Sequence, residues 1–388
     1  MDTPERQGSP VRMERMRELD LLRFAAALAV LLFHFTGFGG GGAWPDPSRD
    51  IFPLLGEVTR YGYLGVDLFF VISGFVILMS VWGRTAGEFG VSRIVRLMPA
   101  YWAAVLLGLV IYLATGLGKG KPGLVLPNLT MLQGGLGTGN VDAVFWTLWV
   151  ELHFYVLIAL LAAVGLTYRR CIMFMTAWLF LGLYADEGES KLLQVLVIPT
   201  WNAYFVAGMA LFLIYRFGST LLLWGFVGVS WLMALHWGAW RAGNVFTGVT
   251  DGAVAAVITG IFAIMALVAI RKLSWLSWRG LTVLGALTYP LYLTHSQIAL
   301  PVLDWIYPGM NRWAALAVVM AASLLLAYVI HRLVERPAAA WLRDRLRAAL
   351  ARAREIDFPK PVPAPRPAAE PVEPSGELVG GPGPRVPS

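Results

Sequence analysis

The sequence is poor in two kinds of residue, and each scarcity limits what the protein can be. Only 14% of its 388 residues are charged, where a soluble globular domain carries about 25%. It contains a single cysteine, Cys171, which excludes an intrachain disulfide and a metal cage made of several cysteines. Apolar residues make up 57% of the chain, with 16 Trp among them. A bilayer accommodates this composition, because apolar side chains that face lipid need no burial inside protein.

Apolar segments recur along the chain and predict transmembrane helices. Each is long enough, or nearly so, to cross a hydrocarbon core that takes about 20 helical residues. The predicted fold class is an all-α polytopic membrane protein with about ten transmembrane helices. Their predicted positions are residues 19–38, 61–82, 97–117, 143–166, 171–185, 195–215, 219–239, 252–270, 281–303 and 312–333.

The distribution of basic residues predicts the orientation of these helices. If the N-terminus is cytoplasmic, the inner loops contain more Arg and Lys than the outer loops along the whole chain, as the positive-inside rule requires. Both termini are then cytoplasmic. The formal net charge of +7 is explained by this topology and by attraction to anionic lipid, so it does not indicate binding to nucleic acid.

Three regions differ in composition. Residues 1–18 form a basic cytoplasmic tail, and residues 19–337 form the transmembrane domain. In residues 338–388 an Arg-rich amphipathic helix, expected to lie on the anionic inner leaflet, precedes a disordered tail rich in Pro, Ala and Gly. The outer segments 39–60 and 118–142 are rich in Gly, and they either shape a binding site or act as connectors.

Ionisable residues inside the predicted helices are the strongest functional signal, because each costs roughly 2.5–3.5 kcal/mol at mid-membrane on insertion scales. In the first segment Arg23 and His34 are eleven residues apart, which places them on one helix face about 16 Å apart along the axis. Asp20 lies one turn before Arg23. A buried ion pair that fixes helix packing, with a satisfied core histidine, is the alternative interpretation.

Three further segments carry polar groups. Asp67 lies in the second, followed by Ser73 and Gly74, small residues that allow close helix packing. The fourth segment places Thr147, Glu151 and Tyr155 on one face, and the ninth contains Tyr292 and His295 as i, i+3 neighbours. We expect His34, Asp67, Glu151 and His295 to lie at similar depth in the outer half of the membrane.

This arrangement suits acid–base chemistry on one side and anion binding on the other. A histidine with a carboxylate is the minimal set of groups for general-base catalysis on a hydroxyl. Arg93 and Arg96, at the cytoplasmic end, have the i, i+3 spacing that presents two guanidinium groups to a polyphosphate. They are equally explained as anchors of the positive-inside rule.

Six short motifs, in order, resemble the acyltransferase-3 family of bacterial membrane O-acyltransferases over residues 17–340. They are RELDLLRFAAALAVLLFHF with Arg23 and His34, GYLGVDLFFVISGF, SRIVRLMPAYW with Arg93 and Arg96, FWTLWVELHFY with Thr147 and Glu151, LTYPLYLTHSQI, and VERP. Each motif alone is weak, and their order together with the topology makes the resemblance strong.

The resemblance implies transfer of an acyl group, usually acetyl, from cytoplasmic acyl-CoA to a hydroxyl, usually of an extracytoplasmic or lipid-linked carbohydrate. His34 and Glu151 are then the expected catalytic residues: His34 acts as general base oriented by Glu151, or accepts the acyl group transiently. Arg23, Arg93 and Arg96 are expected to bind acyl-CoA, a co-substrate rather than a permanently bound cofactor. The expected supporting polar residues are Asp67, Thr147, Tyr155, Tyr292 and His295, with no metal.

Two other classes of function fit parts of the pattern. A secondary transporter uses buried His, Glu and Asp as a proton relay, although no paired broken helices appear in two halves of the sequence. A binding protein without activity is the second alternative. The expected location is the bacterial inner membrane, and no feature of the sequence specifies an oligomeric state.

Overall fold

The computed structural model describes residues 15–38, 44–187, 190–245, 248–307 and 309–357, together with Gly381 and Gly383. The chain divides into one unit at residues 1–347 and a second at 348–388, and the fold discussed below is that of the first unit. The predicted basic tail up to residue 14 and most of the predicted disordered tail from residue 358 lie outside the described residues.

All ten predicted membrane segments are helical, and the described part of the chain contains no β-strand. The long helices are α1 (Arg17–Leu32), α4 (Gly65–Val81), α5 (Ala86–Thr115), α7 (Trp146–Val164), α8 (Tyr168–Glu187), α10 (Pro199–Phe217), α11 (Leu221–Asn244), α12 (Asp251–Ala269), α13 (Gly280–Ile306) and α14 (Arg312–Ile330). Within the described ranges, eight helical segments are long and apolar enough to cross a membrane. The other two predicted spans, α8 and α13, contain more polar residues.

Shorter helices follow or connect these. They are the π-helix η1 (Phe33–Gly37), α2 (Ser48–Ile51), α3 (Pro53–Thr59), η2 (Arg60–Leu64), α6 (Pro122–Leu129), η3 (Ala143–Phe145), α9 (Lys191–Val197), the π-helix η4 (His331–Glu335) and α15 (Arg336–Asp357). The η1 π-turn continues α1 directly, so His34 lies in a helix of altered register.

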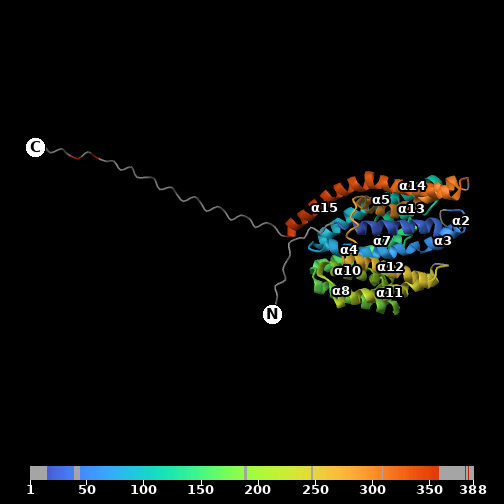
Figure 1. Ribbon diagram of the computed structural model, residues 1–388. Helices are drawn as coiled ribbons and strands as arrows, with labels where there is room; N and C mark the ends of the chain where they lie inside the picture. The colour runs from blue at the N-terminus through green and yellow to red at the C-terminus, as the bar shows by residue number, and fades with distance from the viewer. Residues whose placement is uncertain are drawn as a thin grey trace. The chain divides into compact units, whose positions relative to one another are not determined.

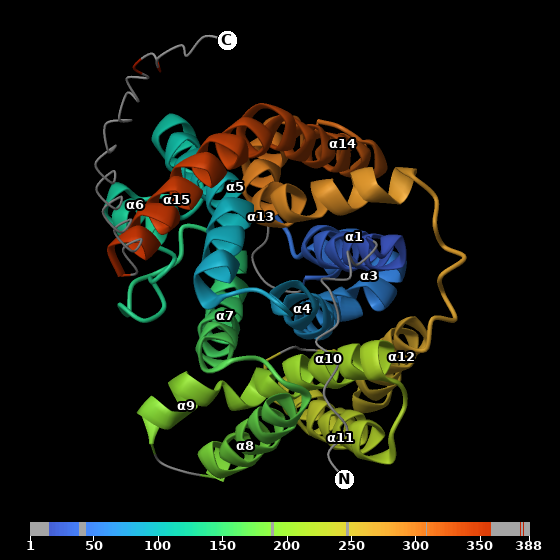
Figure 2. The ribbon, with the colours of Figure 1, turned by 90° about the vertical axis from the view of Figure 1, so that its left-hand side faces the viewer.

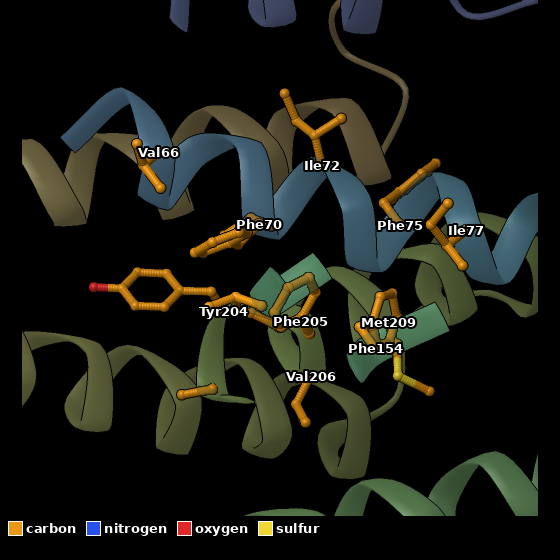
Figure 3. Packing of buried hydrophobic residues seen from close by; sticks show 14 of the residues in the cluster. Val66, Phe70, Ile72, Phe75, Ile77, Phe154, Tyr204, Phe205, Val206 and Met209 are labelled. Carbon is orange, nitrogen blue, oxygen red and sulfur yellow. The ribbon is translucent and has the colours of Figure 1, made fainter. Parts of the chain in front are cut away.

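The centre of the fold is the crossing of α4 and α10, where two glycines meet. A side-chain carbon on Gly74 would lie 2.2 Å from the carbonyl oxygen of Phe205, and one on Gly208 would lie 2.1 Å from that of Val71. The predicted role of Gly74 as a close-packing residue of α4 is thus confirmed. Large apolar side chains fill the space on either side of this crossing, among them Phe70 (Figure 3).

The long helices of the first unit form two groups that meet at this crossing. On one side, α8, α11 and α12 pack around α10, while on the other α4 belongs to a group with α1, α5, α7 and α13 (Figure 1). Every residue of α10 from Asn202 to Ile214 is buried, which explains why its sequence is apolar all round rather than on one face.

The outer segment after α1 folds back onto the end of that helix. The indole N–H of Trp44 donates a hydrogen bond to the carbonyl of Phe35 (2.9 Å), and the hydroxyl of Ser48 donates one to the carbonyl of Phe38 (2.8 Å). The hydroxyls of Thr36 and Thr59 are 2.8 Å apart. These contacts supply partners for backbone carbonyls at the end of η1 and hold its last turn in place.

Candidate active site

Five helices form a closed ring, and the predicted site residues other than Asp67 lie along its interior. In order around the ring, α1 packs against α13, α13 against α5, α5 against α7, α7 against α4, and α4 against α1. Figure 2 looks along these helices and shows them around a common centre. Two side chains on helices that are not neighbours in the ring can approach each other only through its interior.

A pair of histidines occupies the end of the ring that is predicted to face the outer side of the membrane. The Nδ1 atom of His34, in η1, lies 3.0 Å from the Nε2 atom of His295, in α13. His295 is buried, and its own Nδ1 atom lies 3.1 Å from the carbonyl oxygen of Leu291 and 2.9 Å from that of Tyr292. Two of the predicted residues, from opposite ends of the chain, are therefore in direct contact.

Tyr292 and Thr147 join α13 to α7 across the ring, one helical turn from His295. Their hydroxyl oxygens are 3.0 Å apart, and both lie within hydrogen-bonding distance of the Val144 carbonyl. The tyrosine ring also packs edge-on against Phe69 of α4, with ring centres 5.5 Å apart. These contacts fix the position of Tyr292 and, through the shared helix, of His295.

Glu151 belongs to a different part of the site from the one predicted. One of its carboxylate oxygens accepts a hydrogen bond from the hydroxyl of Ser73 (2.7 Å), and the carboxylate lies within electrostatic range of Arg23 and Tyr155. Among the described residues, no hydrogen bond joins Glu151 to His34. The structure therefore places Glu151 between the arginines and the histidines and gives His34 a different partner.

Three arginines form the other end of this path, which the positive-inside rule predicts to be cytoplasmic. Arg23 of α1 lies within electrostatic range of Arg93 and Arg96 of α5, although α1 and α5 are not neighbours in the ring. Arg96 forms an ion pair with Glu335, which also contacts His331. The Nε atom of Arg93 is buried without a hydrogen-bond partner. Positive charge therefore exceeds negative charge here, which is the condition for binding an anion.

Asp67 is separate from this path. Its carboxylate receives two hydrogen bonds from the guanidinium of Arg241, at 2.8 and 2.6 Å, and a third from the hydroxyl of Tyr204 at 2.7 Å. Arg241 in turn lies over the ring of Trp201 at 4.6 Å. The arrangement joins α4, α10 and α11, and it leaves Asp67 fully engaged in holding these helices together.

Asp142, which was not among the predicted site residues, lies beside the histidine pair. Its carboxylate accepts hydrogen bonds from the hydroxyl of Ser296 (2.5 Å) and the backbone N–H of Val144 (3.0 Å), and it lies within electrostatic range of His295 and Lys119. Burial raises the pKa of this carboxyl, and the two hydrogen bonds oppose that rise. Its position immediately before the fourth predicted span, where an N-cap acid is favoured, was the available signal.

The comparisons with known proteins identify the family. The model of the acyltransferase domain family matches residues 16–332, and the chain therefore belongs to this family of acyltransferases. A similar curated protein is Nodulation protein 10 of Rhizobium leguminosarum bv. viciae, which is 25% identical over 359 residues, covering 82% of this chain and 92% of that protein. No solved structure matches.

The family and the fold together define the class of protein. It is a multi-pass membrane acyltransferase, and the path enclosed by α1, α4, α5, α7 and α13 is its candidate active site. Among the described residues, no three His, Cys, Asp or Glu side chains come together as metal ligands.

Proposed function

We propose that the protein is a bacterial inner-membrane O-acyltransferase that moves an acyl group, acetyl in the simplest case, from cytoplasmic acyl-CoA to a hydroxyl of an extracytoplasmic or lipid-linked carbohydrate. The observation that carries the proposal is the polar path itself. It has three guanidinium groups that outnumber the neighbouring carboxylates at one end and a histidine pair at the other, within one ring of helices.

The cytoplasmic end of the path suits the donor. Coenzyme A carries several phosphate charges, and guanidinium groups bind phosphate oxygens through paired charge-assisted hydrogen bonds. Arg23, Arg93 and Arg96 are the residues proposed to do so. Arg23 and His34 are separated by about 16 Å of helix rise, a distance that an extended pantetheine arm covers, so the thioester reaches the histidines while the phosphates stay with the arginines.

The outer end of the path suits the chemical step. His34 removes the proton from the acceptor hydroxyl, and the oxygen attacks the thioester carbonyl. The carbon–sulfur bond then breaks, and the coenzyme A thiolate takes the proton from His34. A variant of this mechanism transfers the acyl group to His34 first and to the hydroxyl second. Glu151 is proposed to balance the charge of Arg23 along the path of the pantetheine arm.

The first test is release of free coenzyme A from acetyl-CoA by the purified protein in nanodiscs, with an envelope glycan fraction as acceptor. His34→Ala is expected to lower the rate by about 10²- to 10⁴-fold, the usual contribution of a general base. His153→Gln is the matched control, because His153 contacts the backbone of its own helix at Trp149 and, within the described ranges, is hydrogen-bonded to none of the predicted site residues. Equal rates for wild type and His34→Ala would remove His34 from the mechanism.

A further inference from the structure

The surroundings of His295 determine which of its ring nitrogens carries a proton. Its Nδ1 atom faces two backbone carbonyl oxygens, those of Leu291 and Tyr292, at 3.1 and 2.9 Å. A carbonyl oxygen only accepts hydrogen bonds, so Nδ1 must be the protonated nitrogen. The ring is buried, and an unpaired imidazolium is costly there. In the resting, neutral ring the Nε2 atom therefore holds a lone pair.

This assignment fixes the state of His34 as well. The Nε2 atom of His295 lies 3.0 Å from the Nδ1 atom of His34, and because Nε2 accepts, Nδ1 of His34 must donate. The carbonyl of Val30, one turn earlier in α1, is a second acceptor for the His34 ring. A neutral imidazole has one proton, so the Nε2 atom of His34 is left unprotonated.

We propose that His295 is a positioning residue that holds His34 in the tautomer with its proton on Nδ1, so that Nε2 of His34 is the atom that takes the acceptor's proton. The inference rests on the proposed function and names the partner that makes His34 competent. In the step itself, Nε2 takes up the hydroxyl proton and Nδ1 keeps its own, with its hydrogen bond to His295 intact. The proton on Nε2 then passes to the departing thiolate, and the pair returns to its starting state.

The same geometry assigns a role to the neighbouring acid. While Nε2 of His34 is protonated the pair carries one positive charge, and the Asp142 carboxylate is the acidic group within electrostatic range of His295. Ser296 and the Val144 backbone hold that carboxylate in place. A carboxylate that stabilises an imidazolium without receiving its proton is a known arrangement in acyl transfer.

Two amide substitutions that differ by one methylene test the proposal. Gln at position 295 places its amide oxygen near the position of Nε2 and can still accept from Nδ1 of His34, whereas Asn reaches only the position of Nδ1. His295→Gln is expected to keep kcat within about tenfold of wild type, and His295→Asn to lower kcat by about 10²-fold or more with KM little changed. Equal losses in both variants, or full activity of His295→Asn, would overturn the proposal.

A spectroscopic test does not depend on activity. The chain has 5 His, so ¹⁵N-histidine labelling of the protein in lipid bilayers gives few signals, and those of His34 are identified by their absence in His34→Gln. We expect His34 to be protonated at Nδ1 in wild type and in His295→Gln, and to be a mixture of tautomers in His295→Asn. Protonation of His34 at Nε2 in wild type would refute the proposal. Absence of coenzyme A release by wild type would instead count against the proposed function.

Discussion

At the scale of single residues, the arginines inside the membrane differ in how their charge is matched. Arg241 is paired with Asp67 through two hydrogen bonds and with the hydroxyl of Tyr204. Arg93 donates a hydrogen bond to the hydroxyl of Ser92 but forms no ion pair within the described residues, and its neighbours Arg23 and Arg96, the latter paired with Glu335, are also cations. A matched buried charge serves packing, whereas a cluster in which cations outnumber carboxylates favours the binding of an anion.

Arg93 is therefore expected to contribute to donor binding. Arg93→Ala should raise the KM for acyl-CoA by about 10- to 100-fold, the value of one or two charge-assisted hydrogen bonds, and change kcat less. Arg84→Ala is the control, because Arg84 is an exposed arginine just before α5. The measurement is the rate of coenzyme A release as a function of donor concentration, and an unchanged KM in Arg93→Ala would argue that Arg93 only anchors the helix.

Asp67 is expected to act on stability. Asp67→Asn leaves the Arg241 charge buried and uncompensated, which costs about 3–5 kcal/mol, so the melting temperature followed by Trp fluorescence should fall markedly. The double variant Asp67→Asn, Arg241→Gln removes both charges and should recover part of the loss. A double variant no more stable than the single one would contradict the role of this pair in packing.

The sequence predicts correctly which residues share a face of a single helix, but it does not predict which other helix that face contacts. The 3.6-residue period places Arg23 and His34 on one face of α1, and the structure puts both along the same ring interior. The period does not say which helix that face meets. His34 was therefore paired with Glu151 in the sequence-based hypothesis, whereas its partner in the structure is His295, 261 positions away. Arg241 lies two residues beyond the predicted span 219–239, so its pairing with Asp67 was not predicted.

At the scale of elements, the crossing of α4 and α10 depends on glycine. Gly208→Ala should destabilise the protein by about 1–3 kcal/mol, because the new methyl group would meet the rigid backbone of Val71 and force the helices apart. Gly228→Ala, within α11 and with open space around it, should be neutral or slightly stabilising because Ala favours a helix. The melting temperatures of the two variants are compared in detergent. Similar values would contradict the close packing of α4 and α10 at Gly208.

The long helices could be predicted from the sequence, and the outer segments could not. Runs of about 20 apolar residues have one stable solution in a bilayer, a helix that satisfies its own backbone. Residues 44–64 and 118–142 have no such constraint. Their structure depends on single side-chain contacts, such as those of the Asn128 amide, which donates to the carbonyls of Leu124 and Gly139. The π-turn that carries His34 has no compositional mark, because it is formed by the same residue types as α1.

At the scale of the whole molecule, the topology predicts that the acyl donor binds from one side of the membrane only. The arginines lie at the end of the path that the positive-inside rule assigns to the cytoplasm. Acetyl-CoA does not cross a bilayer, so it should support transfer only in vesicles whose cytoplasmic face is outward. Free coenzyme A is measured in inside-out and right-side-out vesicles, with detergent-opened vesicles as control. Equal rates in both sealed preparations would contradict this orientation.

The enclosed path also bears on the energy that drives the transfer. In the proposed reaction an acyl group leaves coenzyme A toward the outer side, and a proton from the acceptor hydroxyl returns to the sulfur. Acyl-CoA and coenzyme A carry the same charge, and so do the hydroxyl and its ester, so one turnover moves no net charge through the ring. The membrane voltage, which contributes about 2.3 kcal/mol per elementary charge for every 100 mV, therefore performs no work on this step. Its driving force is the hydrolytic potential of the thioester, so the cell can modify its exterior with metabolic energy spent entirely in the cytoplasm.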